Sequence, residues 1–128
     1  IQFMPLLLGD RLPRAIVQKL LARLTDGGFI TEWGPATESP KSPLYEDDGY
    51  WRGPIWAPTT LLLWDGLRRQ GEMELATTIA EKFCSLASKN GMAENFDARS
   101  GRGLRDRAFA WTSAAYILLA ASLSQDQP

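Results

Sequence analysis

Two short segments of the chain carry side chains suited to binding and cleaving a sugar. Three large aromatic rings and a guanidinium are packed into Tyr50–Trp56. Further along, Glu94 lies in the segment 91–101, which its flanking glycines mark as a loop. Aromatic planes with a few aimed polar groups suit a sugar ring, and hydrolysis of a glycosidic bond requires carboxylates. The two segments therefore predict a carbohydrate site with Glu94 as its catalytic residue.

Several residues of this candidate site also have a structural alternative. Glu94 could be a solvated loop carboxylate, and Trp51 and Trp56 could pack in a core. Gly53 would let the backbone approach a ligand closely, while Pro54 suits the start of a helix. The five donors of the Arg52 guanidinium suit an acceptor-rich ligand. The alternative for Arg52 is a salt bridge to one of three acidic neighbours: Glu46, Asp47 or Asp48.

Two aspartates near Glu94 are predicted to be structural. Asp97 opens the run Asp-Ala-Arg-Ser-Gly, which is typical of a turn whose carboxylate accepts hydrogen bonds from backbone N–H groups. Asp106 is expected to be the N-cap of the last helix. Neither is predicted to take part in catalysis.

The composition excludes several other classes of protein. The chain has no histidine, so Ser-His triads and His-based metal sites are ruled out. The single cysteine, Cys84, stands in a helical pattern and is expected to be a packed thiol. Basic residues are scattered and the net charge is −1, which argues against nucleic-acid binding. We expect no metal and no organic cofactor.

The start of the sequence bears on its completeness and its location. The chain begins at Ile1 without an initiator methionine and without a recognisable targeting segment, so we expect it to be a piece of a longer protein. No apolar run approaches the roughly 20 residues of a membrane-spanning helix, and no membrane partner is predicted. The compartment is not determined, although one cysteine and no signal segment favour the cytoplasm.

Four helices are predicted, over Leu12–Leu24, Ile55–Gln70, Met73–Lys89 and Ala108–Leu123. The first and third have one apolar stripe each, whereas the second and fourth are apolar around nearly their whole circumference. A helix that is apolar all round is buried all round. The alternation favours two layers of helices, with the second and fourth in the inner layer. Two outer helices cannot wrap two inner ones, so we expect residues outside this chain to complete the layer.

Two long connections, 25–54 and 90–107, lead into the N-terminal ends of the inner helices. Long connections in a compact domain are usually functional. Because both enter the same layer from the same end, we expect them to meet and to form a pocket there.

At these residues the chain resembles the C-terminal part of glycoside hydrolase family 63, which is related to the family 37 trehalases. The resemblance extends from about Phe29 to Leu119 and rests on five segments: Thr37–Pro40, Tyr50–Trp56, Gly91–Asp97, Gly101–Gly103 and Trp111-Thr112. It implies an all-α fold, a partial (α/α)6 barrel of inner and outer helices. It also implies inverting hydrolysis, with Glu94 as general base. The residues implied to line or border the sugar pocket are Tyr50, Trp51, Gly53, Trp56 and Trp111.

The general acid implied by the family is an aspartate upstream, and no aspartate before Tyr50 has a matching context. The leading hypothesis is that Ile1–Pro128 is a C-terminal fragment of the catalytic domain of an inverting, exo-acting α-glycosidase that hydrolyses small α-glucosides or related sugars. The expected partners are that substrate and the remainder of the barrel, with self-association through exposed inner-helix faces. The alternatives are a non-catalytic sugar-binding module and a plain helical domain with core tryptophans.

Overall fold

A computed structural model describes residues 1–125, which form a mostly helical fold with one small sheet. The helical elements are a 3₁₀ segment η1 (Met4–Arg11), α1 (Arg14–Asp26), α2 (Ala57–Arg69), α3 (Met73–Asn90) and α4 (Ala110–Gln125). The strands are β1 (Ile55–Trp56), β2 (Asn95–Phe96) and β3 (Gly103–Leu104). The four predicted α-helices are confirmed to within a few residues. Neither η1 nor the strands were predicted.

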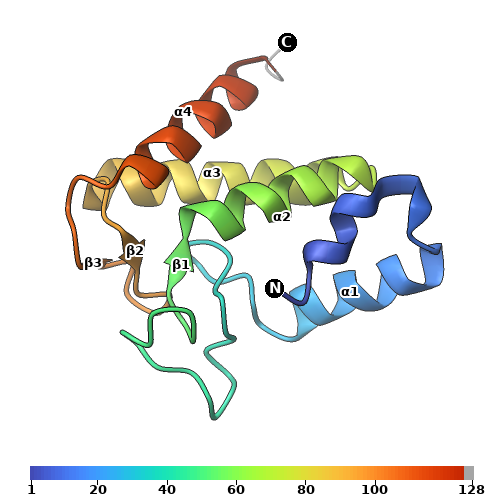
Figure 1. The fold of residues 1–128 in the computed structure, drawn as a ribbon, viewed down its shortest axis with the longest axis horizontal. Helices are drawn as coiled ribbons and strands as arrows, with labels where there is room; N and C mark the ends of the chain where they lie inside the picture. The colour runs from blue at the N-terminus through green and yellow to red at the C-terminus, as the bar shows by residue number, and fades with distance from the viewer. Residues whose placement is uncertain (126–128) are drawn as a thin grey trace.

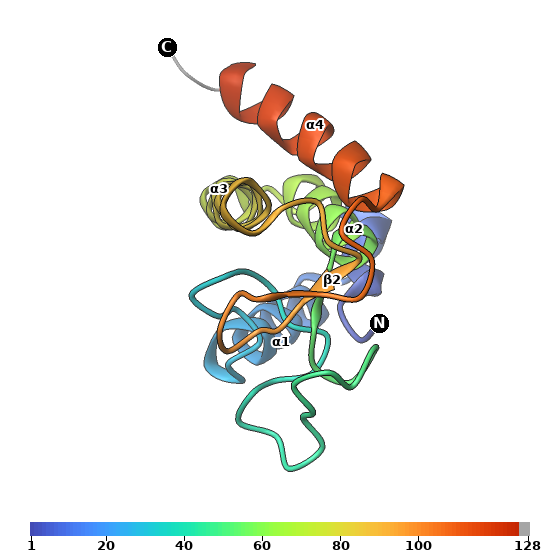
Figure 2. The same cartoon turned by 90° about the vertical axis from the view of Figure 1, so that its left-hand side faces the viewer.

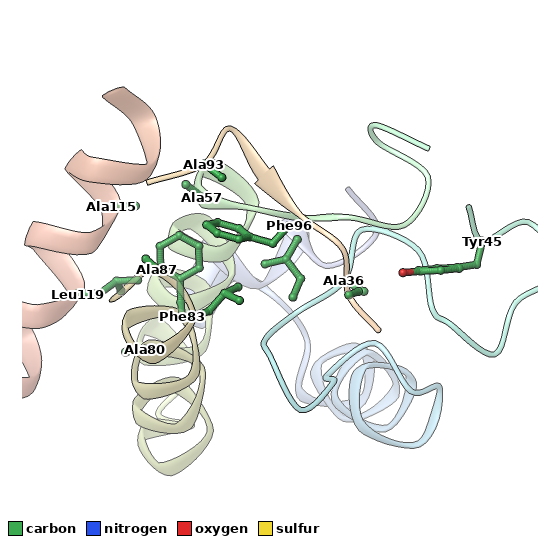
Figure 3. Close-up of a cluster of buried hydrophobic side chains, with 13 residues drawn as sticks. Ala36, Tyr45, Ala57, Ala80, Phe83, Ala87, Ala93, Phe96, Ala115 and Leu119 are labelled. Atoms are coloured by element: carbon green, nitrogen blue, oxygen red, sulfur yellow. The ribbon is translucent and has the colours of Figure 1, made fainter. Parts of the chain in front are cut away.

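The helices enclose two apolar cores. One lies between α2, α3, α4 and the sheet, where Phe96 meets Phe83 edge to face with ring centroids 6.2 Å apart. Figure 3 shows Phe96 reaching from its strand towards Phe83 and Ala87 on the neighbouring helix. The other core joins η1 and α1 to α2 and α3 through buried side chains that include Val17, Leu24 and Ile79. The apolar stripe predicted for α3 therefore faces the interior, whereas in α1 Val17 and Leu24 are buried and Ile16 is 44% exposed.

The face of α4 turned away from the first core is apolar and exposed. Trp111, Ile117 and Leu118 are 54%, 65% and 54% exposed, whereas α4 buries only Thr112, Ala115 and Leu119. In Figures 1 and 2 α4 lies at one edge of the molecule, and its C-terminal end points away from the other helices. The described residues therefore do not bury α4 all round, and the face that they leave exposed is apolar. Among residues 1–125, no helix combines the length and apolarity needed to cross a bilayer.

The sheet joins the two long connections at the start of α2 and α4. Its antiparallel order is β1-β2-β3, with Ile55 opposite Phe96 and Trp56 opposite Asn95. Because side chains alternate between the faces of a strand, Ile55 and Phe96 enter the core. Trp56 and Asn95 share the opposite face. The prediction that the two connections meet at one end of the helices is confirmed.

Candidate active site

Glu94 meets Tyr50, a residue of the other connection. The Tyr50 hydroxyl donates a hydrogen bond of 3.2 Å to Oε1 of Glu94. The backbone of Glu94 is held separately, because its N–H donates to the carbonyl of Asp106 at 2.7 Å. Desolvation raises the pKa of Tyr50, and the hydrogen bond and negative charge of Glu94 raise it further. Tyr50 is therefore a neutral donor that orients the carboxylate.

Stacked indoles lie next to this pair. Trp51 lies on Trp56 with ring centroids 4.0 Å apart and planes 17° apart, and Tyr50 meets both rings edge to face. Trp56 is fully buried, and its Nε1 donates to the Tyr50 carbonyl at 2.8 Å. Trp51 is 45% exposed. Trp56 is thus a core residue that supports the site, while Trp51 presents a ring to solvent.

Trp111 extends the aromatic surface onto α4. Its ring centroid is 6.5 Å from that of Trp56, and Phe109 meets Trp111 edge to face at 5.4 Å. An open groove of about 440 Å³ runs between α2 and α4 beside these rings, lined by Trp51, Pro58, Leu61, Trp111, Ala114 and Ala115. The structure therefore brings Glu94 together with the predicted aromatic residues Tyr50, Trp51, Trp56 and Trp111.

The two other predicted site residues, Arg52 and Gly53, both lie against Glu46. Nη2 of Arg52 is 2.8 Å from a carboxylate oxygen of Glu46, so the salt-bridge alternative is the arrangement observed. Gly53 has φ 154°, and a Cβ at this position would lie 2.3 Å from the carbonyl oxygen of Glu46. Glycine is therefore required at position 53 by a close approach to protein backbone.

Arg105 and Asp48 lie next to Tyr50 and Glu94, although neither was predicted to be a site residue. The guanidinium carbon of Arg105 lies 5.0 Å from the centroid of the Tyr50 ring, and its Nη2 is 2.8 Å from Oδ1 of Asp48. Among the described residues, Tyr50 (φ 59°) and Arg105 (φ 62°) are the non-glycine residues with positive φ. Such backbone costs about 1–3 kcal/mol per residue and gathers at functional sites. An arginine in an arginine-rich loop gives no local signal of this role.

Asp97 fixes the turn that follows Glu94. Its carboxylate accepts hydrogen bonds from the Arg99 N–H at 3.0 Å, from the Tyr45 hydroxyl at 2.9 Å and from the Ser100 hydroxyl. Burial acts to raise the pKa of Asp97, but these hydrogen bonds outweigh it and the pKa is lowered. Burial, together with Asp97, raises the pKa of Tyr45. The predicted turn at Asp97 is confirmed, and its partner Tyr45 is new.

The prediction for Asp106 was wrong. Its Oδ1 accepts a hydrogen bond of 3.1 Å from the Ala108 N–H, and α4 begins only at Ala110. Asp106 therefore closes a turn ahead of the helix instead of capping it. The error arose because an Asp-capped helix start and an Asp-closed turn have the same local sequence signature.

Asn95 brings an unpaired polar group to the site. Its side chain is fully buried, and neither amide atom has a hydrogen-bond partner among the described residues. It shares a sheet face with Trp56, its partner in the antiparallel register. An unsatisfied buried group costs about 1–3 kcal/mol, and such groups are rare in native proteins.

Cys84 plays no part in the site. It packs, half-buried, against the first core, and desolvation raises the pKa of its thiol. In the part of the chain that the structure describes, no three Cys, Asp or Glu side chains are grouped so that they could hold a metal ion.

The carboxylates around the aromatic cluster differ in how far they are engaged by other side chains. Asp97 is occupied by three donors and Asp48 by Arg105, whereas the side-chain partner of Glu94 is a neutral phenol. The single side-chain hydrogen bond from Tyr50 therefore leaves further acceptor positions on the Glu94 carboxylate.

Comparisons with known proteins found a matching family and several relatives. Residues 1–112 match the family model described as the mannosylglycerate hydrolase MGH1-like glycoside hydrolase domain. A mannosylglycerate hydrolase of Rubrobacter radiotolerans is 32% identical over 115 residues, which are 87% of this chain and 26% of that protein. A glucosylglycerate hydrolase of Mycolicibacterium hassiacum is 33% identical over 122 residues, 91% of this chain and 27% of that protein.

The structure is also similar to a solved one. The crystal structure of a GH63 mannosylglycerate hydrolase from Thermus thermophilus, in complex with glucose, matches with a TM-score of 0.78 and 29% identity. The match covers 93% of this chain and 30% of that one. The chain thus spans under a third of the length of these relatives.

Proposed function

Because the chain belongs to the mannosylglycerate hydrolase MGH1-like glycoside hydrolase family, we propose that it supplies the general base and part of the sugar pocket of an inverting, exo-acting α-glycosidase. The observation that carries the proposal is the hydrogen bond from Tyr50 to Glu94 beside the exposed ring of Trp51. The proposed substrates are small α-glycosides. Mannosylglycerate and glucosylglycerate come first, because relatives of the chain are named for their hydrolysis.

In the proposed reaction Glu94 activates a water molecule. The water oxygen attacks the anomeric carbon as Glu94 takes one of its protons. The bond from that carbon to the glycosidic oxygen breaks on the opposite face of the sugar. A carboxylic acid there protonates the leaving oxygen, and inverting enzymes place it roughly 6.5–9.5 Å from the base. We propose that this acid lies outside residues 1–128.

The residues around Glu94 have separate proposed roles. Tyr50 holds the carboxylate in the orientation that removes the proton. Trp51, with its ring supported by Trp56, packs against an apolar face of the sugar, and Trp111 borders the pocket on the side of α4. The observed contacts of Arg52 and Gly53 support structural roles for both.

We further propose that α2 and α4 are inner helices of a partial (α/α)6 barrel, with α3 in the outer layer. The contacts of α3 with both α2 and α4 support this arrangement. So do the exposed apolar side chains of α4, which the remainder of the barrel would cover. The proposed partner of this chain is thus the rest of its own catalytic domain.

The test is Glu94→Gln in the full chain, by which we mean the full-length protein that carries residues 1–128. The variant is assayed on mannosylglycerate and glucosylglycerate. Loss of the base should lower kcat by about 10²-fold or more. In the wild-type reaction the sugar product should appear first as the inverted anomer. Glu81→Gln is a matched control, because Glu81 is an exposed glutamate of α3. Full activity of Glu94→Gln would refute the role of Glu94, and a retained anomer would refute inversion.

A non-catalytic sugar-binding module is the second candidate. The observation that favours it is that Asp97 and Asp48, the other carboxylates next to the cluster, are already engaged. A wild-type full chain that binds these sugars but cleaves none of them would establish it.

A further inference from the structure

Two tyrosines of one segment make the same set of contacts twice. Tyr45 donates its hydroxyl to Asp97 at 2.9 Å, and Tyr50 donates its hydroxyl to Glu94 at 3.2 Å. A guanidinium lies over each ring, that of Arg99 at 4.4 Å and that of Arg105 at 5.0 Å. The segment 45–50 thus docks on 94–105 through two equivalent contact sets.

The equivalence extends to the ion pairs. Arg99 pairs with Asp47 at 3.1 Å, and Arg105 pairs with the adjacent Asp48 at 2.8 Å. We call the first set the inner quartet, made of Tyr45, Asp47, Asp97 and Arg99. We call the second set the outer quartet, made of Tyr50, Asp48, Glu94 and Arg105.

The two quartets differ in what their carboxylates do. In the inner quartet Asp97 is buried and also accepts hydrogen bonds from Ser100 and from backbone, so it serves the fold. In the outer quartet Glu94 is only half-buried, and its carboxylate meets the neutral hydroxyl of Tyr50. Both non-glycine residues with positive φ among the described residues, Tyr50 and Arg105, lie in the outer quartet. The same contact plan therefore holds a structural carboxylate in one place and the proposed base in the other.

We propose that Arg105 and Asp48 are positioning residues for Glu94, acting through Tyr50. Asp48 fixes the guanidinium of Arg105, the guanidinium fixes the Tyr50 ring, and the Tyr50 hydroxyl fixes the carboxylate. This inference rests on the proposed role of Glu94 as the base. Arg105 needs no contact with the substrate, because it acts on Glu94 only through the ring of Tyr50.

The contacts of Arg105 set the geometry of the site more than they stabilise the fold. An exposed ion pair and an exposed cation–π contact each contribute little to folding. A displacement of a catalytic group by about 1 Å can nevertheless lower the rate about 10²-fold. Loss of Arg105 should therefore lower kcat much more than it lowers the stability of the protein.

The experiment compares Arg105→Met with Arg99→Met in the full chain. Both substitutions keep most of the apolar stem and remove a guanidinium from over a tyrosine ring, so they are matched. We expect Arg105→Met to lower kcat at least about tenfold with KM within about threefold, and Arg99→Met to leave kcat within about threefold. Asp48→Ala, which leaves both tyrosines in place, should give a weaker version of the Arg105→Met effect.

Three results would overturn the inference. They are an unchanged kcat in Arg105→Met, an equal loss in Arg99→Met, or a rise in KM alone, which would mark Arg105 as a substrate contact. Rescue adds a further check. Lysine restores the charge but not the planar stack, so Arg105→Lys should recover only part of the lost kcat.

A readout without catalysis separates this inference from the proposed function. The positive charge of Arg105 acts to lower the pKa of Tyr50. Removing it in Arg105→Met should raise the ionisation midpoint of Tyr50 in an ultraviolet titration, assigned by difference from Tyr50→Phe. If the wild type cleaves no glycoside, the proposed function fails, while this shift still reports whether Arg105 acts on Tyr50. An unshifted midpoint would count against the coupling even in an active enzyme.

Discussion

Trp51 lies flat on Trp56, with 4.0 Å between the ring centroids, yet one ring is 45% exposed and the other is fully buried. The stack therefore joins a surface residue to a core residue. The exposed ring of Trp51 can contact a ligand, whereas the buried ring of Trp56 fixes the position and tilt of the Trp51 ring.

Substitution should separate these two roles. Trp56→Ala is expected to lower the free energy of unfolding by about 3–5 kcal/mol, the usual cost of removing a buried tryptophan. Trp51→Ala should cost only about 0.5–1.5 kcal/mol from the lost stack, but should weaken sugar binding. Denaturant unfolding and calorimetric titration with the sugar measure the two effects. Equal losses of stability would contradict the assignment.

The two tyrosines offer a second contrast. Tyr45→Phe removes a donor from the buried Asp97 carboxylate, so the free energy of unfolding should fall by about 1.5–3 kcal/mol. Tyr50→Phe removes the donor from Glu94 and should lower kcat by about tenfold or more with a smaller change in stability. Chemical denaturation and steady-state kinetics on both variants provide the comparison. A kcat loss confined to Tyr45→Phe would reverse the assignment.

Acid should destabilise the protein in part through Asp97. Its pKa in the folded state lies below the ordinary value of 3.8, so the unfolded state binds more protons in that range and stability rises with pH there. The contribution is complete above the unfolded value and is lost as the pH falls through the folded value. Asp97→Asn should be less stable at neutral pH and should show a flatter decline towards acid. Unfolding curves between about pH 2 and pH 6 test the slope, and parallel slopes would exclude Asp97 as its source.

The unpaired side-chain amide of Asn95 should lower the free energy of unfolding. Its amide is buried without a partner among residues 1–125, so Asn95→Leu, similar in size, should leave the free energy of unfolding unchanged or raise it by about 1–3 kcal/mol. We expect the same variant to lose activity, because the polar group lies on the face of the sheet that carries Trp56. Thermal unfolding and kinetics on one preparation measure both. A clear loss of stability would mean that the amide has a structural partner.

The apolar face of α4 should cause association when residues 1–128 are prepared alone. Ile117 and Leu118 are exposed there together with Trp111, and exposed apolar patches of this kind promote association. Leu118→Glu should reduce the concentration-dependent association seen by sedimentation, and should destabilise the full chain if the barrel covers that face. A segment that stays monomeric at high concentration would argue against this role for α4.

The helices were predictable because their apolar residues recur at helical spacing over 13 to 18 residues. The strands were not, because each has only two residues and two residues cannot show an alternating pattern. For the same reason the sequence showed that the two connections meet but not how they pair.

The site was predictable to the extent that residue type decides the role. Glu94 and the aromatic residues have side chains whose chemistry suggests their use. Arg52 and Arg105 have the same side chain, and only the fold directs one to Glu46 and the other to Tyr50. The pairing of Arg105 with Asp48 joins residues 57 positions apart, which no local pattern reports.

The pairing of Trp56 with Asn95 has a consequence for insertions between α2 and α3. The helical hairpin of α2 and α3 leaves the sheet at Trp56 and returns to it at Asn95, so its length does not set the distance from the indoles to Glu94. The turn between the two helices includes Gly71, which is exposed, and no described atom lies within 4 Å of where its Cβ would stand. We therefore expect an insertion at that turn to leave Glu94 beside the stacked rings of Trp51 and Trp56.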